Sequence, residues 1–260
     1  MLIDFEKLAQ DFVSNKICTV SSKKDVSLDE QKYIIAQLAG KIGFNSDNFL
    51  TIEGMNHQNL DMNFRNEGFY SKFFQSRMHV DLPRAKGGNQ IAFLISMCMK
   101  VFECAKPDGN TYFLNMQDVL KKLSFNTKDL SHIKISFVHD DHRYVSPVIF
   151  THEIFNEDTL FWPTSNVELF SGEPELFASI KSEVQEVMSN YSNWYEHKWS
   201  ANDVVIFDNL SMLHSFTPGW TRDQRIFNQV CCNCITPTYL NKNVDIWKDW
   251  NDSTCLISNQ

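Results

Sequence analysis

The chain has 260 residues, 43% of them hydrophobic and 22% charged, which is the composition of a globular protein large enough to bury a real core. A formal net charge of −8 without long runs of Lys or Arg argues against a nucleic-acid partner. The longest apolar run, residues 91–101, is too short to span a membrane, and no apolar leader follows Met1. Seven cysteines without a secretion signal indicate reduced thiols, so we expect a cytoplasmic protein.

Two helices are predicted in the first 45 residues. The first has apolar residues at helical spacing, namely Phe5, Leu8, Phe12 and Val13. The second begins with a capping box formed by Ser27 and Glu30. Its apolar stripe consists of Ile34, Ile35, Leu38 and Ile42. A short strand over residues 48–53 and a long loop over residues 54–78 follow.

From residue 90 onward the sequence is rich in β-branched and aromatic residues. The predicted strands are residues 90–101, 111–116, 133–138, 145–150, 203–207 and 226–235. Many short strands separated by turn-prone segments are typical of a sandwich, barrel or jelly roll. One helix interrupts them: it begins around Pro174, where acidic residues suit the helix dipole, and is expected to end near Asn193. Its predicted buried stripe is Leu176, Ile180, Val184, Val187, Met188 and Tyr191.

Two segments carry residues suited to a metal. His79 and Asp81 are two positions apart, so in extended chain they point to the same side. With one further imidazole, such as that of His214, they would form the two-histidine, one-carboxylate face that suits Fe(II) and leaves the opposite face open. Arg225 follows His214 by eleven residues, and a buried arginine needs an anionic partner. A dicarboxylate co-substrate on the metal could offer its far carboxylate to that side chain.

The combination of HVD at residues 79–81, NDVVIFDN at residues 202–209, His214 and Arg225 resembles the TauD/TfdA family of Fe(II)- and 2-oxoglutarate-dependent dioxygenases. This family includes the clavaminate-synthase-like enzymes. The resemblance extends over about residues 75–235. It implies a double-stranded β-helix, or jelly roll, in agreement with the many predicted strands.

The resemblance also implies roles for individual residues. His79, Asp81 and His214 are the implied iron ligands and catalytic centre. Arg225 and Thr111, the latter in the segment DGNTYFLNM, are the implied partners of the distal carboxylate of 2-oxoglutarate. Because Asp81 is present, oxygenation rather than halogenation is expected.

On the substrate side, four residues are candidates for contacts: Gln75, Phe113, Arg143 and Gln229. Taurine dioxygenase carries an arginine four residues beyond its co-substrate arginine, whereas this chain has Gln229, so a sulfonate held in that way is not expected. Arg143 ends the segment HDDHR at residues 139–143, which could be a second metal site, a substrate clamp or, on the simpler interpretation, a solvated turn.

Other conspicuous residues have simpler interpretations. Lone histidines such as His152 and His197 are interpreted as surface or structural groups. The cysteines of the segment CCNC, residues 231–234, lack a partner pair at zinc-site spacing and are interpreted as small core residues.

The sequence therefore predicts one dioxygenase domain over residues 1–260, with a helical part over about residues 1–45 and a jelly-roll core over about residues 48–236. The mostly β chain with flanking helices is expected to bind Fe(II), 2-oxoglutarate and O2. It would hydroxylate, desaturate or cyclise a small molecule, such as an amino-acid-derived biosynthetic intermediate, with release of succinate and CO2. Two alternatives stay open: a non-catalytic jelly roll that binds metal or a small molecule, and a zinc-type hydrolase or isomerase that uses the same triad.

Overall fold

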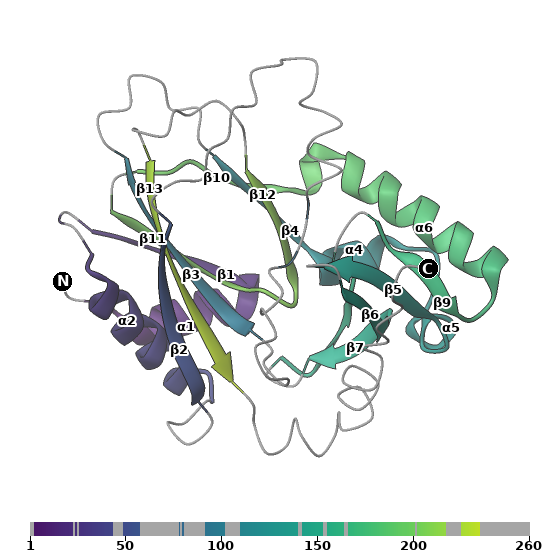
Figure 1. Ribbon diagram of the computed structural model, residues 1–260, viewed down its shortest axis with the longest axis horizontal. Coiled ribbons are helices and arrows are strands. Elements are labelled where there is room, and N and C mark those ends of the chain that lie inside the picture. Colours follow the sequence, from purple (N-terminus) through teal and green to yellow (C-terminus); the bar gives the residue numbers. More distant parts are fainter. Residues whose placement is uncertain are drawn as a thin grey trace.

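In the computed structural model, the described residues are 3–22, 24, 26–43, 49–57, 78, 80, 92–101, 110–139, 142–152, 155–163, 166–200, 202–216 and 225–234. They form a mostly β protein with a jelly-roll core and flanking helices (Figure 1). In this part of the chain, every helix is too short or too polar to cross a membrane.

The jelly roll is built from two facing antiparallel sheets. The five-stranded sheet has the order β1 (Ile17–Ser21), β11 (Asp203–Asp208), β3 (Ala92–Val101), β13 (Arg225–Cys234) and β2 (Phe49–His57). The three-stranded sheet has the order β10 (Tyr195–His197), β4 (Thr111–Asn115) and β12 (Met212–Phe216). They pack together through Phe113 of β4 and Phe207 of β11, whose ring centroids lie 5.0 Å apart.

Helices α1 (Phe5–Asn15) and α2 (Leu28–Lys41) pack beside the five-stranded sheet (Figure 1). The predicted capping box is confirmed, because the Ser27 hydroxyl accepts from the Glu30 amide and the Glu30 carboxylate accepts from the Ser27 amide. Helix α1 ends where Lys16 adopts a left-handed conformation with φ of 61°. Of the apolar residues at helical spacing in α1, Leu8 and Phe12 are buried, whereas Val13 is 40% exposed; Ala9 is buried as well.

The rest of the chain adds smaller sheets and helices beside the three-stranded sheet (Figure 1). One sheet has the order β6 (His142–Pro147), β5 (Lys134–His139) and β9 (Glu168–Ser171), and another pairs β7 (Ile149–His152) with β8 (Glu157–Leu160). The helices of this region are α4 (Met116–Lys122), α5 (Thr127–Leu130), α6 (Pro174–Ser189) and the 3-10 turn η3 (Tyr191–Asn193).

Some predicted boundaries were wrong for identifiable reasons. The predicted strand 145–150 is divided between β6 and β7, because the Val148 amide donates to Ile133 O and its carbonyl accepts from the Phe161 amide. Strand β2 continues to His57, inside the predicted loop, because it keeps pairing with β13. Helix α6 ends at Ser189 instead of near Asn193, and Tyr191, predicted to be buried, is 52% exposed.

Two glycines provide a test of the local backbone. Gly172 has φ of +124°, and an added Cβ would lie 2.6 Å from Ile133 Cδ1, whereas a Cβ on Gly40 of α2 would meet nothing within 4 Å. We expect Gly172→Ala to lower the free energy of unfolding by about 1–3 kcal/mol, and Gly40→Ala to raise it by up to about 1 kcal/mol. Urea unfolding measures both, and equal effects from the two variants would contradict the backbone argument.

Candidate active site

His214 lies between the two facing sheets. It sits in β12 directly opposite Phe113 of β4, and its side chain is 5% exposed. Its ring centroid lies 5.1 Å from that of Phe207 in the five-stranded sheet and 6.3 Å from that of Phe113. The two aromatic rings therefore restrict the imidazole and shield it from bulk water.

The turn before β12 is fixed on three sides, and this sets the position of His214. The Asp208 carboxylate accepts from the Leu210 amide at 3.1 Å, and the Asp208 amide donates to Lys16 O at 2.8 Å. The Met116 amide donates to Ser211 O at 2.8 Å. A turn that is tied to the end of α1 and to the start of α4 can hold β12 in one register.

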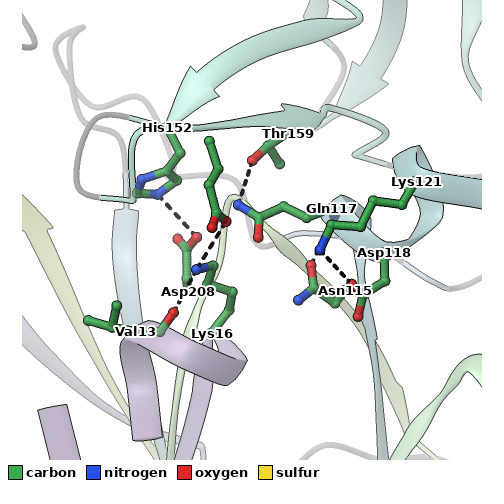
Figure 2. Close-up of polar contacts among 10 residues, drawn as sticks. Val13, Lys16, Asn115, Gln117, Asp118, Lys121, His152, Thr159 and Asp208 are labelled. Atoms are coloured by element: carbon green, nitrogen blue, oxygen red, sulfur yellow. Dashed lines mark hydrogen bonds and ion pairs between the residues drawn. The ribbon is translucent and has the colours of Figure 1, made fainter. Parts of the chain in front are cut away.

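A buried histidine and carboxylate lie beneath this turn. His152 Nε2 is 3.1 Å from Asp208 Oδ2, and both side chains are buried (Figure 2). Next to them, Lys16 Nζ donates to Val13 O at 2.6 Å and lies 3.3 Å from a Glu157 carboxylate oxygen. The same ammonium group lies over the ring of Phe155. His152 is therefore a structural group, in agreement with its interpretation from the sequence.

Thr111 occupies the same face of the three-stranded sheet as His214. It lies opposite Phe216 of β12 and opposite His197 of β10, two residues before Phe113. Its side chain is 3% exposed, and its hydroxyl accepts a hydrogen bond from Trp199 Nε1 at 2.8 Å. A buried hydroxyl thus stands on the interior face that also carries the His214 imidazole.

The segment that follows β10 joins the two sheets at the Thr111 end. The Asp203 carboxylate accepts from Ser21 Oγ at 2.7 Å and from the Ser200 amide at 2.9 Å. His197 Nε2 lies 3.4 Å from the same carboxylate. Because His197 is opposite Thr111, the beginning of β11 lies close to the beginning of β4.

Backbone register places Arg225 at this end too. Asp203 is opposite Met99 of β3, and Arg225 is opposite Val101, two residues further along that strand. Met99 pairs with Asp203 on one side and with Phe227 on the other, so these three positions share one face of the sheet. Position 225 is two residues before Phe227 and therefore belongs to the same face. The two predicted partners of the distal carboxylate, Thr111 and Arg225, therefore belong to facing sheets at the same end of the jelly roll.

The other two predicted iron ligands, His79 and Asp81, lie outside the described residues. Their described neighbours Met78 and Val80 are buried, and the Val80 amide donates to Pro163 O at 3.1 Å. Of the predicted triad, the structure thus describes His214, and the described ranges contain no cluster of three or more potential ligands.

The four substrate candidates are distributed over different elements. Phe113 lies on the His214 face, as stated above, whereas Gln75 lies outside the described residues. The backbone of Gln229 is in the middle of the five-stranded sheet, opposite Met97 and Met55.

Arg143 is in β6, opposite Val138, in a sheet separate from that of His214. The strands β5 and β6 pair up to His139 and His142, so the predicted turn is shorter than residues 139–143.

A cavity of about 760 Å³ opens elsewhere, between α1, the edge strand β1 and the start of α4. Its lining includes Phe113 and Met212 but neither Thr111 nor His214. Several of its polar groups already have protein partners, for example Asp118 with Lys121 and Lys16 with Glu157 (Figure 2). It therefore adjoins the candidate site through a shared aromatic wall and is not itself the predicted site.

Two titratable groups in these strands, the Cys18 thiol and the Tyr112 hydroxyl, stay protonated at neutral pH. Burial raises the pKa of the Cys18 thiol in β1, so the thiol stays protonated and is a poor nucleophile. Burial, together with the hydrogen bond to Glu196, raises the pKa of Tyr112 to about 12. Tyr112 points to the other face of β4 from Thr111, so it is a structural donor and not a group of the site.

The sequence did not single out Trp199 or Phe207 as site residues, although both lie in the segment that carries the family resemblance. Phe207 could have been found, because in an extended strand it shares its face with Val205 and Asp203. The partner of Trp199, Thr111, is 88 residues away, and no local pattern reveals that contact.

Residues 58–231 match the sequence profile of the family described as taurine catabolism dioxygenase TauD, TfdA family. A taurine dioxygenase from Burkholderia xenovorans has a similar fold, with a TM-score of 0.64, 14% identity, and coverage of 91% of this chain and 84% of that one. The structure of AAD-2 with Mn(II) and N-oxalylglycine gives a TM-score of 0.61, 14% identity and coverage of 91% and 92%. The structure of PvcB, an Fe, alpha-ketoglutarate dependent oxygenase from an isonitrile synthetic pathway, gives a TM-score of 0.59 and 13% identity. The match covers 90% of this chain and 83% of that one. No curated protein matches at a significant level.

The buried Asp208 carboxylate yields a stability prediction. Asp208→Ala removes both the acceptor of the Leu210 amide and the neighbour of His152, so we expect the free energy of unfolding to fall by roughly 3 kcal/mol. Asp208→Asn retains an acceptor for the Leu210 amide and should cost clearly less, about 1 kcal/mol. Urea unfolding of both variants checks this order, and equal losses would contradict it.

Proposed function

The chain belongs to the TauD/TfdA family of dioxygenases, and from this premise we propose that it is an Fe(II)- and 2-oxoglutarate-dependent oxygenase of a small molecule. One observation carries the proposal: the buried His214 imidazole and the buried Thr111 hydroxyl share one face of the three-stranded sheet. Position 225 of the facing sheet lies at the Thr111 end. This arrangement supports a metal end near His214 and a carboxylate end near Thr111, which a chelating dicarboxylate needs.

In this proposal, His79, Asp81 and His214 hold the iron, and Thr111 and Arg225 bind the distal carboxylate of 2-oxoglutarate. The donor set suits the metal, because two imidazoles and one carboxylate favour Fe(II) and leave positions open. Two related structures support the assignment, since one contains Mn(II) and N-oxalylglycine and the other belongs to an Fe, alpha-ketoglutarate dependent oxygenase.

When bound, iron would activate O2, the oxidant, while 2-oxoglutarate would be decarboxylated to succinate and CO2 as the substrate is oxidised. The chain itself supplies position and exclusion of water. Phe113 and Phe207 hold the imidazole of His214 in place from opposite sheets. Thr111 offers a hydroxyl in a site shielded from solvent, where a hydrogen bond to a carboxylate is strong.

For the substrate, we propose a small and amino-acid-derived molecule, which is hydroxylated, desaturated or cyclised. Phe113 is the best-supported candidate for a wall of its pocket, because it faces the same interior as His214. Gln75, Arg143 and Gln229 stay predicted contacts. We further propose that residues 1–260 form one dioxygenase domain that works in the cytoplasm, as its reduced cysteines suggest.

The reaction class can be tested without a substrate. Fe(II) and 2-oxoglutarate are added to the protein without oxygen, and we expect the visible charge-transfer band of a metal-chelated keto acid. His214→Ala should abolish the band because it removes a ligand. Iron that binds without producing a band would contradict the proposal and favour a binding protein, and hydrolysis or isomerisation with Zn(II) alone would favour the zinc enzyme.

The role of Arg225 is tested by comparing two keto acids. We expect Arg225→Ala to weaken 2-oxoglutarate binding by about 10- to 100-fold, because a charge-assisted hydrogen-bond pair is lost. Pyruvate, which has no distal carboxylate, should bind both proteins equally, and iron should stay bound. Titration of the charge-transfer band measures both affinities. Loss of iron with unchanged 2-oxoglutarate affinity would contradict the assignment.

A further inference from the structure

We infer that Trp199 is a positioning residue for 2-oxoglutarate, because its indole N–H directs the Thr111 hydroxyl so that the hydroxyl proton points to the distal carboxylate. This inference rests on the proposed function. It concerns a residue that acts through Thr111 and does not itself touch the co-substrate.

The direction of the hydrogen bond is determined by chemistry. An indole nitrogen can donate and cannot accept, so Trp199 Nε1 at 2.8 Å must donate to Thr111 Oγ1. A threonine hydroxyl has one proton and two lone pairs, so this bond occupies a lone pair and leaves the proton for another partner. Among the described residues, Trp199 is the one hydrogen-bond partner of that hydroxyl.

Because the Thr111 hydroxyl is buried, its proton requires a hydrogen-bond acceptor. The Thr111 side chain is 3% exposed, and a buried hydroxyl that donates to nothing costs free energy. A carboxylate only accepts, so it complements the free proton and could not replace the indole. Donation from Trp199 also polarises the hydroxyl and strengthens the bond that it donates, by roughly 10–30%.

The indole is itself held in place before any ligand binds. The ring of His197 meets the ring of Trp199 edge to face at 4.4 Å and 82°. Trp199 also packs against the cluster of Phe113, Val205, Phe207 and Met212. The next residue is fixed, because the Ser200 amide donates to Asp203 at 2.9 Å. A preorganised donor of this kind costs little ordering entropy when the ligand arrives.

The experiment is a double-mutant cycle read from the charge-transfer band without oxygen. We expect Trp199→Phe to weaken 2-oxoglutarate binding by about fivefold, the worth of one neutral hydrogen bond, and to leave pyruvate binding unchanged. Thr111→Val should weaken 2-oxoglutarate binding further. In the Thr111→Val background, Trp199→Phe should have no additional effect, because its action passes through the hydroxyl.

Trp194→Phe is the matched control. Trp194 also donates its indole N–H at 2.9 Å, but to Met188 O at the end of α6, so its loss should change 2-oxoglutarate affinity by less than about twofold. Trp199→His, which can retain a ring N–H, should recover part of the lost affinity. If Trp199→Phe does not fold, Trp199→Tyr is measured with the same two keto acids.

Three outcomes would overturn the inference. Unchanged 2-oxoglutarate affinity in Trp199→Phe would overturn only the inference about Trp199. The proposed function would then stand, because the wild-type protein still forms the charge-transfer band. Equal weakening of 2-oxoglutarate and pyruvate binding would show a merely structural role. Additive losses in the double variant would show that Trp199 acts independently of Thr111. Absence of the band in wild type would overturn both the inference and the proposed function.

Discussion

The contact between Phe113 and Phe207 is the constraint on which the candidate site depends. Their ring centroids are 5.0 Å apart, and they join the three-stranded sheet to the five-stranded sheet where His214 lies. Because His214 is paired with Phe113 across β4 and β12, any change in the spacing of the sheets moves the imidazole as well. Removal of a buried phenyl ring typically costs about 3–5 kcal/mol, so this spacing is strongly held.

Strand β11 connects this aromatic contact to both ends of the site. All six of its residues are buried, and it begins and ends with an aspartate. Asp203 organises the segment after β10 through Ser21 and the Ser200 amide, and Asp208 organises the turn before β12 through the Leu210 amide. Buried carboxylates are tolerated only with such partners. One strand thus fixes the segment after β10 with one carboxylate and the turn before β12, the strand of His214, with the other.

Much of the fold could be predicted because it depends on local patterns. The capping box of Ser27 and Glu30 and the apolar run of β11 are readable in sequence, and both proved correct. Strand β12, which carries His214, was missed because Leu213 and His214 are buried on opposite faces and no polar alternation appears. Helix α4 was missed because it follows β4 without a break, started by the Asn115 cap.

Candidate site residues could be proposed from residue types, whereas their arrangement could be predicted only in part. The family resemblance supplied Thr111, His214 and Arg225, because their chemistry and spacing are conspicuous. It could not supply Trp199, because a hydrogen bond across 88 residues depends on how β10 pairs with β4. Contacts that orient another side chain follow from tertiary structure, so sequence motifs do not contain them.

An acidic chain of net charge −8 must still accept a dianionic co-substrate, and the partners of Asp203 show how the local charge is compensated. Its two oxygens receive donors from Ser21 and Ser200, and His197 lies 3.4 Å away. Hydrogen bonds to a carboxylate spread and offset its charge, so Asp203 opposes an incoming carboxylate less than an isolated aspartate would. At this end the Thr111 hydroxyl is buried on the interior face, and the backbone of residue 225 belongs to the facing sheet. Under the proposed function, in which Thr111 and Arg225 bind the distal carboxylate, the same few hydrogen bonds that fix the ends of β11 would favour a ligand with a second carboxylate.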